Sequence, residues 1–168
     1  MPTIHPSAFV APTSVVIGSV TLEADTSVWY QAVLRADLAP IVVGAQSNIQ
    51  DGTVVHVDTG VPCIIGGRVG VGHRVILHGC VVEDECLIGM GAVLLNGVRI
   101  GTGSVVAAGA VLPEGMVIPP RSLVMGVPGR IVRQVDADLS RRIAATWAHY
   151  VDLARQHGEG RYPLAGAH

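Results

Sequence analysis

Every sixth residue is aliphatic in the stretch ILHGCVVEDECLIGMGAVLLNGVRIGTGSVVAAGAVLPEGMVIPPRSLV, which spans residues 76–124. The series runs Ile76, Val82, Ile88, Leu94, Ile100, Val106, Leu112, Ile118 and Val124. An amphipathic helix repeats every 3.6 residues, so it does not explain a spacing of six. Six is the period of hexapeptide solenoids, in which short strands coil around a shared apolar core. The stretch therefore predicts an all-β solenoid, a parallel β-helix of hexapeptide repeats.

Small residues strengthen this prediction. They stand four places after most of the aliphatic positions, where a tight corner excludes large side chains: Cys80, Cys86, Ala92, Ser104, Ala110 and Ser122. Cys80 and Cys86 occupy this corner position in successive repeats, so we interpret them as inert core thiols. The third cysteine, Cys63, leaves an odd number, and no C-x-x-C pair is present, which disfavours a disulfide framework or a zinc knuckle.

The same period covers the earlier part of the chain. Three further series complete it: Val10, Val16, Leu22, Val28 and Leu34; Val43, Ile49 and Val55; Ile65, Val71 and Leu77. Extra residues around Ala39 to Ile41 predict a small bulge, and DTGVP at 58–62 predicts a loop because Gly and Pro interrupt the pattern. Three sides per turn predict roughly six to seven turns.

The repeat ends near GVPGR, residues 126–130, and a different pattern follows. Asp136 to Asp138 offer a helix N-cap. Apolar residues then recur at helical spacing: Leu139, Ile143, Trp147, Tyr150, Val151 and Ala154. We predict a solenoid domain over residues 1–132, a C-terminal α-helix over 133–158 that packs on the solenoid, and a flexible tail over 159–168.

Composition excludes several classes of function. The net charge of −2 provides no basic field for nucleic acid. No uncharged apolar stretch approaches the roughly 18 residues of a membrane helix. The N-terminal residues MPTIHPSAFV lack the features of a signal peptide. We therefore expect a cytoplasmic protein without nucleic-acid or membrane partners.

Assigning each hexapeptide to one of the three faces of the solenoid brings several polar residues together on the same face. The residue after each inward aliphatic position points outward, because side chains alternate along a strand. On one face these residues are Arg35, His56 and His78 in three consecutive turns. Stacked strands lie about 4.8 Å apart, so two imidazoles in such a column can share one metal ion.

The adjacent face carries Gln50, Asp51 and His73 at outward positions. His73 is five residues before His78 but lies around a corner of the solenoid, so within one chain it is badly placed to complete the site. A neighbouring subunit can supply it, and a cyclic trimer closes that arrangement three times. Three neutral imidazoles with an open fourth position are a catalytic metal geometry. They suit zinc, Zn²⁺, and also Fe²⁺ or Co²⁺.

These residues resemble the gamma-class carbonic anhydrase family. The resemblance extends over nearly the whole chain and rests on RAD at 35–37, NIQDGTVVH at 48–56 and GHRVILHGC at 72–80. It implies a left-handed β-helix, a homotrimer with metal sites between subunits, and reversible hydration of carbon dioxide to bicarbonate, a lyase reaction.

The resemblance also implies roles for individual residues. His56 and His78 would bind the metal from one subunit and His73 from the next. Arg35 would form ion pairs at the trimer interface with Asp37 and Asp51. The remaining predicted catalytic residues are Gln50 and Asn48, which would orient the bound hydroxide and the substrate, and Tyr150, which would match a family tyrosine that faces the metal.

The hydration reaction also requires a proton to leave the metal-bound water. The chain departs from the family pattern at the acidic residues that serve this step. Leu38 stands where active members carry a glutamate, and the short loop 58–62 has Asp58 as its only acid. The pocket asparagine is not evident near Tyr150. Three alternatives therefore stay open: a weakly active or non-catalytic metal-binding trimer that serves as a scaffold for a partner, a metal-dependent esterase or thioesterase, and a hexapeptide acyltransferase.

Overall fold

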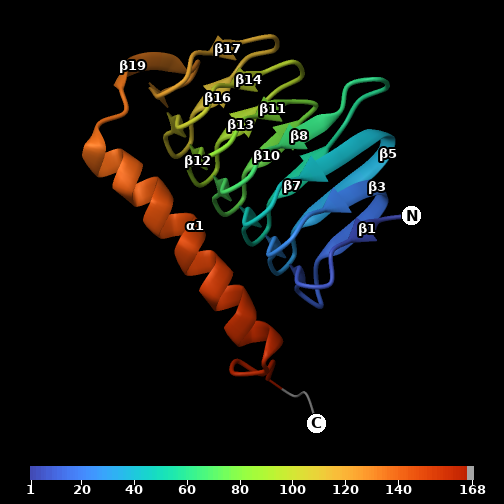
Figure 1. Cartoon of the computed structure of the whole chain (residues 1–168). Helices are drawn as coiled ribbons and strands as arrows, with labels where there is room; N and C mark the ends of the chain where they lie inside the picture. The colour runs from blue at the N-terminus through green and yellow to red at the C-terminus, as the bar shows by residue number, and fades with distance from the viewer. Residues whose placement is uncertain (166–168) are drawn as a thin grey trace.

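Each hexapeptide forms one short strand whose aliphatic side chain points into a common core. The computed structural model describes residues 1–165 and has the architecture of a left-handed parallel β-helix of about 7 turns with one C-terminal helix (Figure 1). The buried residues form one continuous core along the solenoid axis, including Ile49, Leu94 and Ile118. The predicted fold class is confirmed.

Three faces follow one another around each turn. Face a consists of β2 (Phe9–Val10), β4 (Ser27–Val28), β6 (Asn48–Ile49), β9 (Gly70–Val71), β12 (Leu87–Ile88), β15 (Val105–Val106), β18 (Ser122–Met125) and β19 (Arg130–Gln134). Face b consists of β7 (Val54–His56), β10 (Ile76–His78), β13 (Val93–Leu94) and β16 (Val111–Leu112), preceded by the first halves of β3 (Val15–Leu22) and β5 (Val33–Val43). Face c contains the second halves of β3 and β5 with β1 (Thr3–Ile4), β8 (Cys63–Ile65), β11 (Val81–Val82), β14 (Arg99–Ile100) and β17 (Val117–Ile118).

The phase of the repeat at residues 76 and 77 is settled by burial. Leu77 is fully buried, whereas Ile76 is 42% exposed. The unbroken spacing of six therefore begins at Val82, and the inclusion of Ile76 in that series is wrong. The series from Ile65 through Val71 to Leu77 holds the correct phase, and one residue is dropped before Val82.

Both predicted irregularities lie on the solenoid surface. Between β3 and β5 the pairing shifts from Gly18↔Ala36 to Val20↔Ile41, so residues 37–40 bulge outward. The bulge thus lies slightly earlier than predicted, and Ile41 itself is buried in the core. The loop 58–62 is closed by a backbone bridge between Asp58 and Val61.

The C-terminal helix α1 (Ala137–Gly158) lies along face a and runs back toward the N-terminal coils (Figure 1). Asp136 caps it by accepting a hydrogen bond from the backbone N–H of Leu139 at 2.9 Å. Gly70 allows the close approach, because a Cβ at this position would lie 3.1 Å from the Thr146 methyl group. Within the described residues, no helix is long and apolar enough to cross a membrane.

The segment before the helix differs from the predicted boundary at residue 133. Residues 130–134 form β19, which pairs antiparallel with β18 and covers the last turn of the solenoid. Arg133 and Gln134 are therefore strand residues, and the helix begins at Ala137. In the predicted tail, Tyr162 donates a hydrogen bond to Gln156 of the helix, and residues 166–168 lie outside the described part of the chain.

The three cysteines are buried and unbridged. A hydrogen bond with Cys63, together with burial, raises the pKa of the Cys80 thiol. Burial raises the pKa of the Cys86 thiol to about 12. Both thiols are therefore protonated at neutral pH and behave as small core side chains.

Truncation of one core residue tests the assigned phase. Ile118 is 1% exposed and its neighbour Val117 is 64% exposed on the same strand. Ile118→Ala is expected to lower the free energy of unfolding by about 2–5 kcal/mol, because it opens a cavity in the column. Val117→Ala is expected to change it by less than about 0.5 kcal/mol. Denaturant unfolding of both variants measures the difference, and equal effects would contradict the inward assignment.

Candidate metal centre

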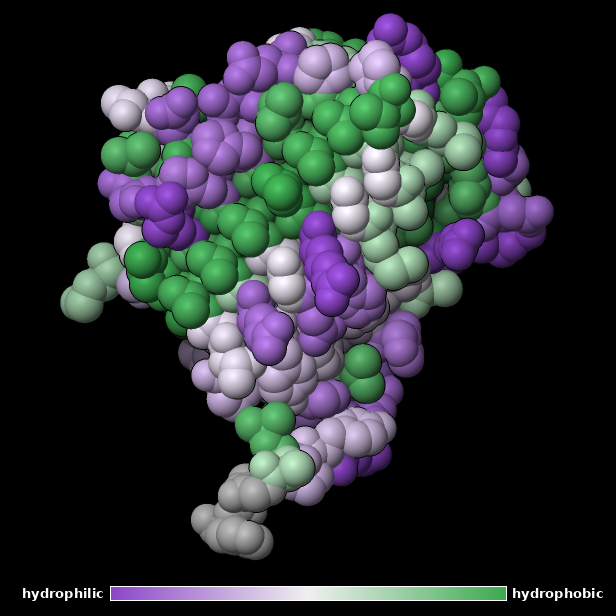
Figure 2. Space-filling model, turned by 180° about the vertical axis from the view of Figure 1, so that it is seen from behind, coloured by the Kyte–Doolittle hydropathy of each residue, from purple (hydrophilic) through white to green (hydrophobic). Residues whose placement is uncertain are grey.

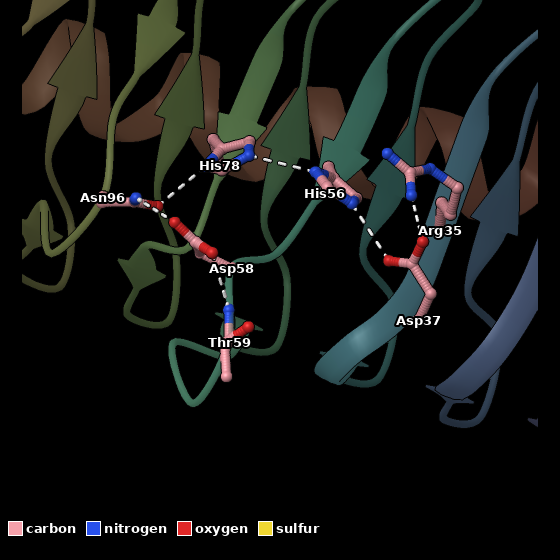
Figure 3. Close-up of polar contacts among 7 residues, drawn as sticks. All are labelled: Arg35, Asp37, His56, Asp58, Thr59, His78 and Asn96. Atoms are coloured by element: carbon pink, nitrogen blue, oxygen red, sulfur yellow. Dashed lines mark hydrogen bonds and ion pairs between the residues drawn. The ribbon is translucent and has the colours of Figure 1, made fainter.

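Arg35, His56 and His78 form a column on face b. The pairing of β5, β7 and β10 places Arg35 beside His56 and His56 beside His78 in adjacent coils. The predicted alignment is therefore present in the structure. The imidazole nitrogens meet directly, with Nδ1 of His56 3.0 Å from Nε2 of His78 (Figure 3).

This pair fits one metal ion. Tetrahedral zinc with two bonds of about 2.1 Å needs nitrogens about 3.4 Å apart, so a small opening of the pair would accommodate it. The two rings are held by backbone ladders on both sides, since β7 pairs with β5 and β10 pairs with β13. The pair could therefore supply two nitrogen ligands to one metal ion.

An ion pair extends the column toward the N-terminus. Arg35 donates to Asp37, and the other oxygen of Asp37 lies 3.0 Å from Nε2 of His56. Desolvation opposes ionisation of Asp37, but hydrogen bonds from His56 and Arg35 outweigh it and keep the pKa of the carboxyl below its usual value. In the single chain Arg35 thus pairs with Asp37. Its predicted contact with Asp51 across an interface stays a prediction.

Two residues beyond the predicted set complete the column at its other end. Asn96 Oδ1 lies 2.7 Å from Nδ1 of His78, and Asn96 Nδ2 donates to Asp58 at 3.4 Å (Figure 3). The spacing argument missed Asn96 because it stands at a corner, one place beyond the outward position occupied by Leu95. A polar residue at the corner of the coil after His78 was the available signal.

The third predicted ligand, His73, lies on face a. His73 Nδ1 is 2.9 Å from Asp51 Oδ2, in the stacked arrangement that the spacing predicts. Gln50 is 5% exposed and donates to Asn48 Oδ1 at 2.9 Å. Asn48 Nδ2 is buried without a hydrogen-bond partner in the described structure. Asn48 and Gln50 therefore form a buried amide pair beside His73.

Tyr150 of α1 lies on the same face of the solenoid as His73. It lies against Trp29, with ring centroids 5.3 Å apart. Burial, and to a smaller extent the Asp51 carboxylate, raise the pKa of its hydroxyl above the usual value. A cavity of about 470 Å³ between α1 and face a is lined by Gln50, His73 and Tyr150, and the rest of its wall is mostly apolar, with Arg142 and Thr146 as further polar side chains.

One chain thus carries the three predicted ligands in two separate places, which are two candidate half-sites. Face b presents His56 and His78, and face a presents His73. Among residues 1–165 of a single chain, no three His, Cys, Asp or Glu side chains are grouped to hold a metal ion. Completion of a three-histidine site therefore needs a second chain.

Known proteins with similar sequences identify the family to which the chain belongs. The family model of the bacterial transferase hexapeptide (six repeats) matches residues 79–114. A protein named probable carbonic anhydrase from Methanocaldococcus jannaschii is 50% identical over 145 residues, which cover 86% of this chain and 91% of that protein. The chain belongs to the gamma-class carbonic anhydrase family.

Two further comparisons show other proteins that the chain resembles. Gamma carbonic anhydrase 1, mitochondrial, from Arabidopsis thaliana is 41% identical over 170 residues, covering 97% of this chain and 62% of that protein. A solved Bacillus cereus structure, described provisionally as an acetyltransferase, superposes with a TM-score of 0.92 at 34% identity, covering 93% of this chain and 91% of that chain. Proteins that share this fold are therefore named for more than one activity.

The raised pKa of Tyr150 can be measured directly. We expect one of the three tyrosines to ionise above the usual range of about 10, and its signal to disappear in Tyr150→Phe. Asp51→Asn should move that ionisation downward, since it removes a negative charge that opposes tyrosinate. Tyrosinate absorbance during alkaline titration provides the measurement, with Tyr162→Phe as the exposed control. Identical titration curves for the parent and Asp51→Asn would contradict the effect of the Asp51 charge on the pKa of Tyr150.

Proposed function

We propose that this chain is a metal-dependent carbonic anhydrase that hydrates carbon dioxide reversibly as a homotrimer. The observation that carries the proposal is the 3.0 Å approach of the His56 and His78 nitrogens in adjacent coils. Membership of the carbonic anhydrase family supports carbon dioxide as the substrate. We propose zinc as the metal, with Fe²⁺ and Co²⁺ as alternatives, and the cytoplasm as the compartment.

The trimer would join the two half-sites. If face b of one subunit packs beside face a of the next, His73 meets the neighbour's histidine pair, and a threefold ring repeats this contact three times. Exposed apolar surface supports such packing. Val15 and Ile17 of β3, Val54 of β7 and Ile76 of β10 are 38–45% exposed. Figure 2 shows a band of apolar side chains across the back of the molecule.

The residues around the proposed site would have different roles in the reaction. A divalent metal ion, when bound, supplies the Lewis acidity that lowers the pKa of water. Asp37 accepts from His56 and fixes the orientation of that ring. The Gln50–Asn48 pair would hold the polar substrate oxygen, and Tyr150 stays protonated at neutral pH and can donate a hydrogen bond. Arg35 would tie this arrangement to the trimer interface.

Mixed trimers test the division of ligands between subunits. His73→Ala homotrimers and His56→Ala/His78→Ala homotrimers should both lose metal. When the two chains are co-expressed with different tags, every mixed trimer contains one interface where an intact His73 faces an intact pair. We therefore expect one metal ion per mixed trimer, measured by elemental analysis of doubly purified protein.

Two results would contradict this assignment. Full metal content in His73→Ala homotrimers would remove His73 from the ligand set. Mixed trimers without metal, at the correct mass, would show that the two half-sites do not meet. Replacing His149, which is exposed on α1, by Ala provides the matched control and should leave the metal content unchanged.

The proposed reaction is tested by stopped-flow hydration of carbon dioxide. The trimer should be loaded with zinc in one sample and with iron(II) under anaerobic conditions in another. We expect a hydration rate that falls by at least about 100-fold in His56→Ala, because loss of one ligand removes the metal. A fully metallated trimer without any rate would instead assign a metal-binding scaffold role.

A second candidate is hydrolysis of esters or thioesters. The cavity of about 470 Å³ beside His73 has a largely apolar wall that includes Leu87, Val105 and Leu139, which could hold an acyl group. Release of nitrophenol from nitrophenyl esters of increasing chain length would support it if longer acyl chains react faster. Consumption of acetyl-coenzyme A with an amine acceptor would favour an acyltransferase instead.

A further inference from the structure

Asn96 connects a histidine of the proposed metal site to the short loop at 58–62. Its carbonyl oxygen lies 2.7 Å from Nδ1 of His78, and its amide nitrogen donates to Oδ2 of Asp58 at 3.4 Å. The other oxygen of Asp58 accepts the backbone N–H of Thr59 at 2.8 Å. The chain of contacts therefore runs from the loop backbone through Asp58 and Asn96 to the imidazole (Figure 3).

The chemistry of Asp58 fixes the orientation of the Asn96 amide. An ionised carboxylate is only an acceptor, so the group that faces it must be the amide NH₂. Rotating the amide by half a turn would place its oxygen against the carboxylate and its NH₂ against His78. With the oxygen toward the imidazole, the favourable contact requires a proton on Nδ1 of His78.

We propose that Asn96, oriented by Asp58, is a positioning residue that keeps neutral His78 as the Nδ1–H tautomer. A neutral imidazole carries one ring proton, so its Nε2 is then unprotonated and directed at His56, 3.0 Å away. An unprotonated nitrogen is what a metal ligand requires. The purpose assigned to this tautomer rests on the proposed function, whereas the tautomer itself follows from the contacts.

The backbone is shaped to admit Asn96. Gly79 directly follows His78 and has a φ of +53°, a left-handed conformation that favours glycine. A Cβ at Gly79 would lie 2.4 Å from Asn96 Oδ1 and 2.8 Å from a methyl group of Val61. The missing side chain therefore leaves room for both the amide and the loop.

The loop is folded so that Asp58 stays in reach. The backbone N–H of Val61 donates to the carbonyl oxygen of Asp58 at 2.9 Å, which closes a tight turn at the start of the excursion. The side chain of Val61 then packs toward Gly79. Asp58 and Val61 of the loop thus converge on one side of His78 with Gly79 and Asn96, which come from two successive coils.

The tautomer can be read in the metal-free protein by ¹⁵N NMR of labelled histidine, with the His78 signals assigned by their loss in His78→Gln. In the parent we expect a protonated Nδ1. Asn96→Leu keeps the volume but removes the acceptor, so His78 should shift to the Nε2–H form or to a mixture. Asn96→Asp/Asp58→Asn keeps an acceptor oxygen toward His78 and a donor–acceptor contact between residues 58 and 96, so it should preserve Nδ1–H. Asp58→Ala frees the amide to rotate and should give a mixture.

Zinc affinity, measured by chelator competition, provides the second readout. Asn96→Leu should bind zinc about 10–100-fold more weakly than the parent, and Asn96→Asp/Asp58→Asn should recover much of that loss. Glu114→Leu is the matched control, because Glu114 stands 18 residues after Asn96, one turn further along the same corner. It should change neither the tautomer nor the affinity.

The two possible failures are distinguishable. If His78 keeps a protonated Nδ1 in correctly assembled Asn96→Leu, the positioning role is overturned, whatever metal the protein binds. If the parent shows the expected tautomer but binds no zinc, iron(II) or cobalt(II), the inference about Asn96 stands and the proposed metal-dependent function fails.

Discussion

Parallel hydrogen bonding between successive coils, in fixed register, is the constraint on which the rest of this structure depends. The ladder pairs His78 with His56 and His56 with Arg35, so side chains 22 and 21 residues apart become neighbours. The aliphatic column inside holds that register, because a slip of one residue would turn buried side chains to the surface. Functional side chains therefore gain their positions from the core residues directly before them.

The same constraint explains why much of the site could be predicted. Once the inward positions are known, the outward neighbours follow by alternation, and both Arg35–His56–His78 and Asp51–His73 emerge from counting. Irregular segments had to be counted as loops for this to succeed. The phase at Ile76 shows how sensitive the count is, because a spacing of six fits both Ile76 and Leu77, and only burial separates them.

Other parts of the structure do not follow from the repeat. Asn96 stands at a corner, where side-chain direction depends on the turn rather than on strand alternation, and its contact depends on Gly79 leaving space. Burial of Gln50 depends on the helix lying over face a, which the period of six does not encode. β19 reverses direction and has no place in a parallel repeat, so the helix was predicted to begin too early.

The short loop at 58–62 helps to hold the histidine pair in place, and this role limits its ability to carry protons. Its single acid, Asp58, has one oxygen committed to the Thr59 backbone and the other to Asn96. A carboxylate that orients an amide cannot swing freely to carry protons, since leaving would free the amide that faces His78. Nearby, the bulge places the apolar Leu38 beside Asp37, with 51% of its surface exposed. The acidic groups around the histidine pair thus favour a rigid, well-oriented pair, and in the proposed reaction a fast hydration cycle would have to release its protons directly to solvent or buffer.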